Sequence, residues 1–79
     1  MDVREALRQF ITQDLMRDAR YRLGDDEALI SGGLIDSFSL VELQMFIKNQ
    51  FNVWIDDTEL TVEKVNCLND LVKLVEDRQ

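Results

Sequence analysis

The side chains that most often carry out catalysis are scarce in this chain. It has no histidine and one cysteine, Cys67, so neither a serine–histidine pair nor a Cys/His metal cluster can form. A phosphate-binding glycine loop of the GxxxxGK[ST] type is also absent. A hydrolase built on Ser37 would have only a carboxylate as its general base. The sequence therefore predicts a protein that is not an enzyme.

Two runs of acids, at residues 25–27 and 56–59, could in principle bind a hard cation. Neither run follows the calcium-loop pattern, which needs a central glycine and a terminal glutamate. We expect solvated acidic surface there and no metal site. Cys67 cannot form an internal disulfide, and we expect it to be a small buried apolar residue in a reducing compartment.

The charge of the chain is unevenly distributed. The formal net charge is −7, and residues 23–63 hold nine acids against one base, Lys48, a net charge of −8. Such a field repels nucleic acids and favours partner proteins with basic surfaces. No apolar run approaches the roughly 18 residues of a membrane span, and the N-terminus is charged. We expect a cytoplasmic protein that binds neither membrane nor nucleic acid.

Ser37 lies where a helix should begin, because Asp36 and Ser37 suit an N-cap and a helical apolar pattern continues to about Phe51. Projected at about 100° per residue, this helix shows two apolar stripes. The core stripe is Leu40, Leu43, Ile47 and Phe51. The docking stripe is Phe38, Val41 and Met45, with Ser37 and Lys48 on its flank. Either the helix is buried on two sides, or the docking stripe faces solvent and binds a partner.

The rest of the chain should supply the core around this helix. Residues 3–15 have the apolar spacing of an amphipathic helix, and residues 18–36 form a long loop. A short turn should follow Ile55, and Asn66 can cap a last helix. A strand at 53–55 would have no partner. The sequence predicts one all-α domain over residues 1–79: three main helices, one short helix, and a long loop between the first two. Apolar anchors should pin that loop: Leu29, Ile30, Leu34 and Ile35.

The segment around Ser37, residues 33–43 with the sequence GLIDSFSLVEL, resembles the attachment motif of acyl and peptidyl carrier proteins. The signature of that family is Asp-Ser-Leu, or a close variant, at the start of the second helix. The resemblance extends over nearly the whole chain, in its length, acidity, long first loop and short third helix. It covers Phe51 as well, the aromatic residue that ends the second helix.

The resemblance implies a covalent 4'-phosphopantetheine on Ser37, transferred from coenzyme A by a phosphopantetheinyl transferase. Asp36 would cap the helix and help the transferase to engage. Docking of partner enzymes would fall to Phe38, Val41, Glu42 and Met45, and to Lys48 beside them. Those partners would be an adenylating or acyl-loading enzyme and downstream synthase, condensing or tailoring enzymes. The carrier itself would be a monomer.

The departures from the family pattern concern the pathway. Lys48, Asn49 and Gln50 stand where carriers of primary fatty acid synthesis have glutamates, and Phe38 replaces the usual leucine. These features resemble stand-alone carriers of polyketide, nonribosomal peptide or aminoacyl pathways. Two alternatives stay open: a carrier of fatty acid synthesis, and an unmodified interaction module in which Ser37 is only a helix cap.

Overall fold

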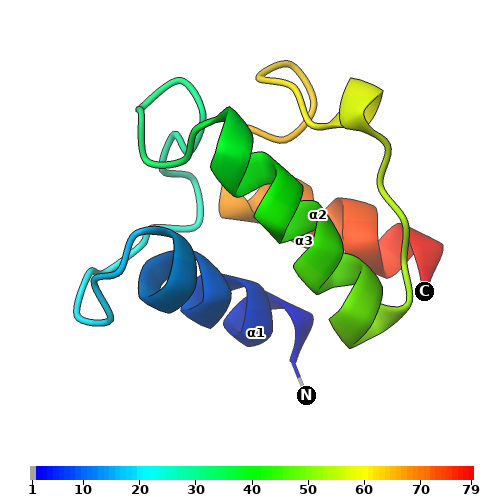
Figure 1. The fold of residues 1–79 in the computed structure, drawn as a ribbon, viewed down its shortest axis with the longest axis horizontal. Coiled ribbons are helices and arrows are strands. Elements are labelled where there is room, and N and C mark those ends of the chain that lie inside the picture. The colour runs from blue at the N-terminus through cyan, green and yellow to red at the C-terminus, as the bar shows by residue number, and fades with distance from the viewer. Residues whose placement is uncertain (1) are drawn as a thin grey trace.

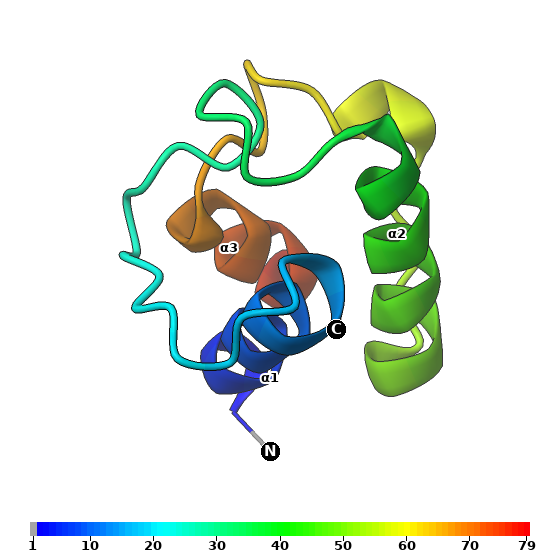
Figure 2. The same ribbon diagram turned by 60° about the vertical axis from the view of Figure 1, so that its left-hand side comes forward.

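A computed structural model describes residues 2–79, and its regular elements are all helical. They are α1 (Val3–Gln9), the π-helix η1 (Phe10–Leu15), α2 (Ser37–Phe51), the 3-10 helix η2 (Asp57–Glu59) and α3 (Leu68–Arg78). Helices α1 and α3 pack side by side, and α2 stands against them on one side (Figures 1 and 2). The predicted all-α class, the three main helices, the short helix and the long first loop are confirmed. No strand occurs at 53–55.

The first helix begins as expected and continues in an unexpected form. Asp2 caps it, since its carboxylate accepts from the backbone N–H of Arg4 at 3.1 Å. From Phe10 onward the helix has π geometry, which the apolar spacing of residues 3–15 did not predict. Thr12 is buried in this segment, and its hydroxyl donates to the carbonyl of Arg8 at 2.9 Å. The segment is followed by Arg17, whose φ of 56° turns the chain away.

The core draws on both connections as well as on the helices. Leu29 and Ile35 of the first loop are buried, as predicted, and Ile30 and Leu34 pack partly against them. Fully buried side chains from the helices complete it. They are Leu7, Ile11, Leu43, Ile47, Leu68, Leu71 and Val75. Because the long loop contributes its own side chains to this core, it is held in place.

Two expectations for the region before α3 are wrong. The N-cap of α3 is Cys67, with no side-chain capping bond, and Asn66 instead directs its side chain to the first loop. Cys67 is half-buried rather than buried. The capping prediction failed because the long-range partners of Asn66 leave no trace in the local sequence.

Candidate functional site

Ser37 is the first residue of α2, and Asp36 fixes where that helix starts. The Asp36 backbone is extended, and its carboxylate accepts from the backbone N–H of Ser39 at 2.8 Å. Hydrogen bonds from the Ser39 backbone and then its hydroxyl stabilise the ionised carboxylate and so lower the pKa of Asp36. The predicted cap is confirmed. Ser37 is exposed at the end of the helix that carries its positive dipole.

The chain approaches Ser37 through a tight turn that needs glycine at two positions. A Cβ on Gly32 would lie 2.3 Å from the carbonyl oxygen of Ala28, and Gly33 has a φ of 77°. The carbonyl of Leu29 then accepts from Leu34 and Ile35, at 2.9 and 3.2 Å. A residue other than glycine would therefore clash at position 32 and would have a strained backbone at position 33, in the turn that leads to the candidate site.

The two predicted faces of α2 separate as the helical projection indicated. Phe38, Val41 and Met45 are exposed by 82, 56 and 51%, so the docking stripe faces solvent and α2 is not buried on both sides. In the core stripe, Leu43 and Ile47 are fully buried, whereas Leu40 and Phe51 are half-buried.

The two charged residues beside the docking stripe, Glu42 and Lys48, are also exposed. Lys48 lies in the last turn of α2, where its ammonium donates to the side-chain carbonyl of Asn52 at 2.9 Å. Asn52 has a φ of 57° and ends the helix. The charge of Lys48 thus lies at the negative end of the helix dipole, where a cation is favourable.

Sequence reasoning missed Gln44, which is only 5% exposed. Its amide nitrogen donates to the carbonyl of Ile55 at 2.6 Å and to the carboxylate of Asp57 at 2.9 Å. These bonds hold η2 against α2. A hollow of about 250 Å³ lies between the two elements, beside the candidate site. Its lining residues are Ser37, Leu40, Val41, Asp57 and Leu60. One feature of the sequence could have indicated the bonds of Gln44. It lies next to the core stripe, where a polar residue needs buried hydrogen-bond partners.

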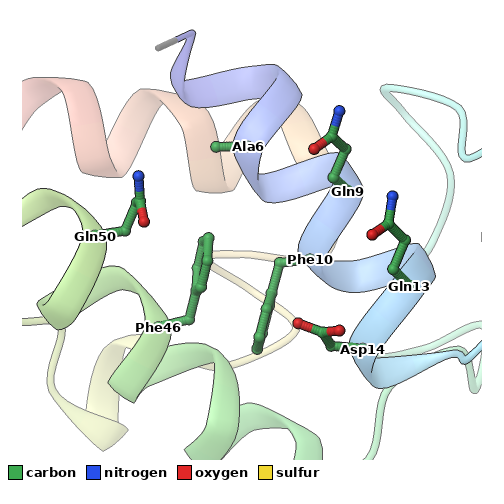
Figure 3. A pocket seen from close by; sticks show the side chains of 7 residues that line it. All are labelled: Ala6, Gln9, Phe10, Gln13, Asp14, Phe46 and Gln50. Carbon is green, nitrogen blue, oxygen red and sulfur yellow. The ribbon is translucent and has the colours of Figure 1, made fainter.

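Phe46 was also missed, because it falls between the two stripes of α2. Its ring stacks on Phe10 of η1, with centroids 4.1 Å apart and an interplanar angle of 11° (Figure 3). Beside this pair, a groove of about 420 Å³ runs along α2 past Val41 and Met45. Glu42 lies on the same groove. The apolar surface therefore extends from the docking stripe onto the first helix.

The comparisons with known proteins agree with this geometry. No family model matches the chain. The D-alanyl carrier protein of Streptococcus suis (strain 98HAH33) is 31% identical over 72 residues, which are 91% of this chain and 89% of that protein. The chain belongs to the acyl and peptidyl carrier protein family. Members of this family generally bear 4'-phosphopantetheine and hold substrates for enzymes as thioesters, so this carrier is not itself an enzyme.

A solved structure described as that of an FAD-dependent dehydrogenase contains a chain with the same fold as this carrier. The TM-score is 0.76 at 31% identity, and the match covers 86% of this chain and 96% of that chain. The matched chain is therefore as short as the carrier.

Within residues 2–79 of the carrier, no helix is long and apolar enough to cross a membrane. The same residues hold no cluster of three or more potential metal ligands.

Proposed function

We propose that Ser37 bears 4'-phosphopantetheine and that the carrier transports an aminoacyl group on it. The observation that supports this proposal best is the exposed Asp36-Ser37 pair at the start of α2, in a chain of the carrier protein family. Asp36 is already occupied as the helix cap, so the Ser37 hydroxyl is the group of the pair that is available for modification.

The chemistry of attachment suits this position. The Ser37 oxygen would form a bond to the β-phosphorus of coenzyme A, the bond from that phosphorus to adenosine 3',5'-bisphosphate would break, and the hydroxyl proton would pass to a base of the transferase. The product at Ser37 is a phosphodiester anion, and the N-terminus of a helix stabilises negative charge. The attached group supplies a terminal thiol that holds cargo as a thioester. Cys67 is half-buried at the start of α3 and has no part in this step.

Intact mass after incubation with coenzyme A and a broad-range phosphopantetheinyl transferase tests the attachment site. We expect one phosphopantetheine on the wild type and on Ser39→Ala, and none on Ser37→Ala. Ser39 is the matched control because it lies in the same turn and is half-buried. A second addition, or labelling of Ser37→Ala, would overturn the assignment. No labelling of the wild type would favour the unmodified interaction module.

For the cargo we propose a small amino acid, in a polyketide, nonribosomal peptide or related aminoacyl pathway. The relative from Streptococcus suis is named for a D-alanyl group, and Lys48 interrupts the acidic helix face expected of fatty acid carriers. The modified carrier should be offered D-alanine, L-amino acids and fatty acids with their respective activating enzymes. A mass increase with an amino acid alone supports the proposal, and loading with fatty acids alone contradicts it.

For docking we propose the surface of α2 formed by Phe38, Val41, Glu42, Met45 and Lys48, all of them exposed.

A flavin-dependent dehydrogenase is one candidate downstream partner. In its support, the short chain that matches this carrier comes from a structure described as an FAD-dependent dehydrogenase, and a chain of that length is too small for a dinucleotide-binding fold. To test this candidate, the aminoacyl carrier is incubated with such an enzyme. Its intact mass before and after incubation shows whether the aminoacyl group has been oxidised.

A further inference from the structure

Asn66, immediately before the N-cap of α3, joins two segments that are far apart in the sequence. Its side-chain oxygen accepts from the backbone N–H groups of Ile30 and Ser31, both at 3.0 Å. Its amide nitrogen donates to the Ser31 hydroxyl at 2.8 Å. Its backbone carbonyl accepts from Leu29 at 2.8 Å. One residue thus holds three consecutive residues of the first loop.

These three residues begin the turn that leads to Ser37. The carbonyl of Leu29 accepts from the N–H groups of Leu34 and Ile35, and the Ile35 side chain is buried in the core. Asp36 follows and caps α2. Residues 29–31, which Asn66 holds, are therefore connected to Ser37 by a short, hydrogen-bonded turn.

The tip of this turn, residues 31–33, is exposed. An enzyme that modifies Ser37 must come close to these residues, because they precede it by only a few positions. A loop that is already ordered loses less conformational freedom when the enzyme binds than a loose one does. The side chain of Asn66 supplies part of that order.

We propose that Asn66 is a positioning residue, which holds residues 29–31 so that the turn before Ser37 has one conformation when the transferase binds. This inference rests on the proposed attachment at Ser37. Asn66 does not touch the reacting atoms. Its effect should therefore appear in the apparent affinity for the transferase, since only the ordered fraction of the carrier binds.

Asn69 provides a matched control, because it bonds an earlier part of the same loop, residues 25 and 26. Its amide nitrogen donates to the Asp26 carboxylate at 2.7 Å, and its side-chain oxygen accepts from Arg4 at 2.5 Å. Its backbone N–H donates to the backbone carbonyl of Asp25 at 3.0 Å. Asn69→Ala removes a side-chain bond to the loop as Asn66→Ala does, but its loop partner Asp26 is five residues farther along the chain from Ser37 than Ser31 is.

Steady-state kinetics of the transferase with the full chain test the inference, at a temperature where circular dichroism shows each variant folded. We expect Asn66→Ala to raise the KM for the carrier about tenfold with kcat unchanged, and Asn69→Ala to change KM by less than about twofold. Asn66→Asp keeps an acceptor for both amides, so its KM should return to within about twofold of the value with Asn66 in place. Asp70 accepts from the backbone N–H of Asn66 at 3.2 Å, a distance at which salt does not screen repulsion between two carboxylates, so Asn66→Asp is made together with Asp70→Asn and compared with Asp70→Asn alone.

Amide hydrogen exchange on the unmodified chain measures the loop directly. Exchange at Ile30 and Ser31 should be about tenfold faster in Asn66→Ala than in the wild type or Asn69→Ala. An unchanged KM or unchanged exchange in Asn66→Ala, an equal rise in Asn69→Ala, or no recovery in Asn66→Asp would overturn the inference. If Asn66→Ala does not fold, Asn66→Leu, which has a similar volume and also lacks the acceptor for Ile30 and Ser31, replaces it, and a KM that does not rise counts against the inference. A wild type that is not labelled contradicts the attachment at Ser37 and leaves the exchange test standing.

Discussion

Lys48 carries the only positive charge between residues 23 and 63, and its ammonium is exposed beside the docking stripe. We predict that Lys48→Glu improves use of the carrier by fatty-acid-type partners, whose basic surfaces favour acids, and impairs the native partner. For an exposed charge we expect KM changes of about two- to fivefold in opposite directions. The changes should shrink with added salt, because exposed charges are screened beyond about 10 Å at 0.1 M.

Two further variants separate this effect from a change in folding. Lys48→Gln removes the charge and should fall between wild type and Lys48→Glu. Lys73→Glu reverses an exposed charge on α3, away from the docking stripe, and should leave both partners unaffected. If native and fatty-acid partners respond alike to Lys48→Glu, Lys48 is a solvated surface charge without a role in partner choice.

At the scale of the element, α2 should respond differently to changes on its two faces. Met45 is 51% exposed, whereas Leu43 is fully buried. We predict that Met45→Ala lowers the free energy of unfolding by at most about 0.5 kcal/mol, as at other surface positions. Leu43→Ala should lower it by about 2 to 5 kcal/mol, because it leaves a cavity in the core. Urea unfolding of the two variants measures both values.

The exposed variant should still impair function. Met45 lines the groove beside the Phe10–Phe46 pair, so Met45→Ala should slow cargo loading although the carrier stays folded. A loading assay on the modified proteins tests this half of the prediction. If Met45→Ala unfolds as readily as Leu43→Ala, the docking surface must lie elsewhere.

The sequence predicted α2 well because its signals are local. Asp36 offered a cap, and the apolar residues that follow recur at the helical period, which separated the buried Leu43 from the exposed Phe38 and Met45. The contacts that the sequence did not predict are long-range. Gln44 meets a carbonyl 11 residues away, and Asn66 meets the first loop 36 residues away.

The stacking of Phe46 on Phe10 is a further long-range contact of this kind. It depends on how α2 lies against η1, and the π geometry of η1 was not predicted either. A hydropathy pattern shows which face of each helix is apolar, but it does not show which side chains of two helices meet. The candidate attachment motif was therefore visible in the sequence, whereas the residues that hold its surroundings in place were not.

In the whole molecule, polar bonds at several points fasten the two connections to the helical core. Arg4 and Arg8 both form ion pairs with Asp25 of the first loop. Gln44 of α2 donates a hydrogen bond to Asp57 of η2. Arg78, at the end of α3, forms an ion pair with Glu59 of η2. The second connection thus lies between two helices and is bonded to each. This connection and the first loop both approach the start of α2 (Figure 2). Ser37 is the first residue of that helix and lines a hollow with Asp57 and Leu60 of the second connection.

The pair of Glu59 and Arg78 predicts how stability depends on pH. The hydrogen bond from the Arg78 guanidinium, and then the one from the Asp56 N–H, lower the pKa of Glu59 from 4.5 to about 2. A carboxylate whose pKa is lower in the folded state stabilises the fold while it is ionised. Its contribution is therefore complete above about pH 4.5 and is lost as the pH falls toward about 2. Arg78 also donates to the Trp54 carbonyl at 3.2 Å, so this contact should survive the protonation of Glu59.

We predict that Glu59→Gln is less stable than the wild type near neutral pH and that the difference narrows between about pH 4.5 and about pH 2. Urea midpoints of both proteins across this range measure the difference. Some loss of stability in acid should remain in the variant, because hydrogen bonds also lower the pKa values of Asp36 and Glu27. Glu63→Gln, which changes an exposed carboxylate in the segment after η2, is the control and should follow the wild-type curve. A Glu59→Gln deficit that stays constant from neutral pH to about pH 2 would show that the ionised Glu59 does not stabilise the attachment of η2 to α3.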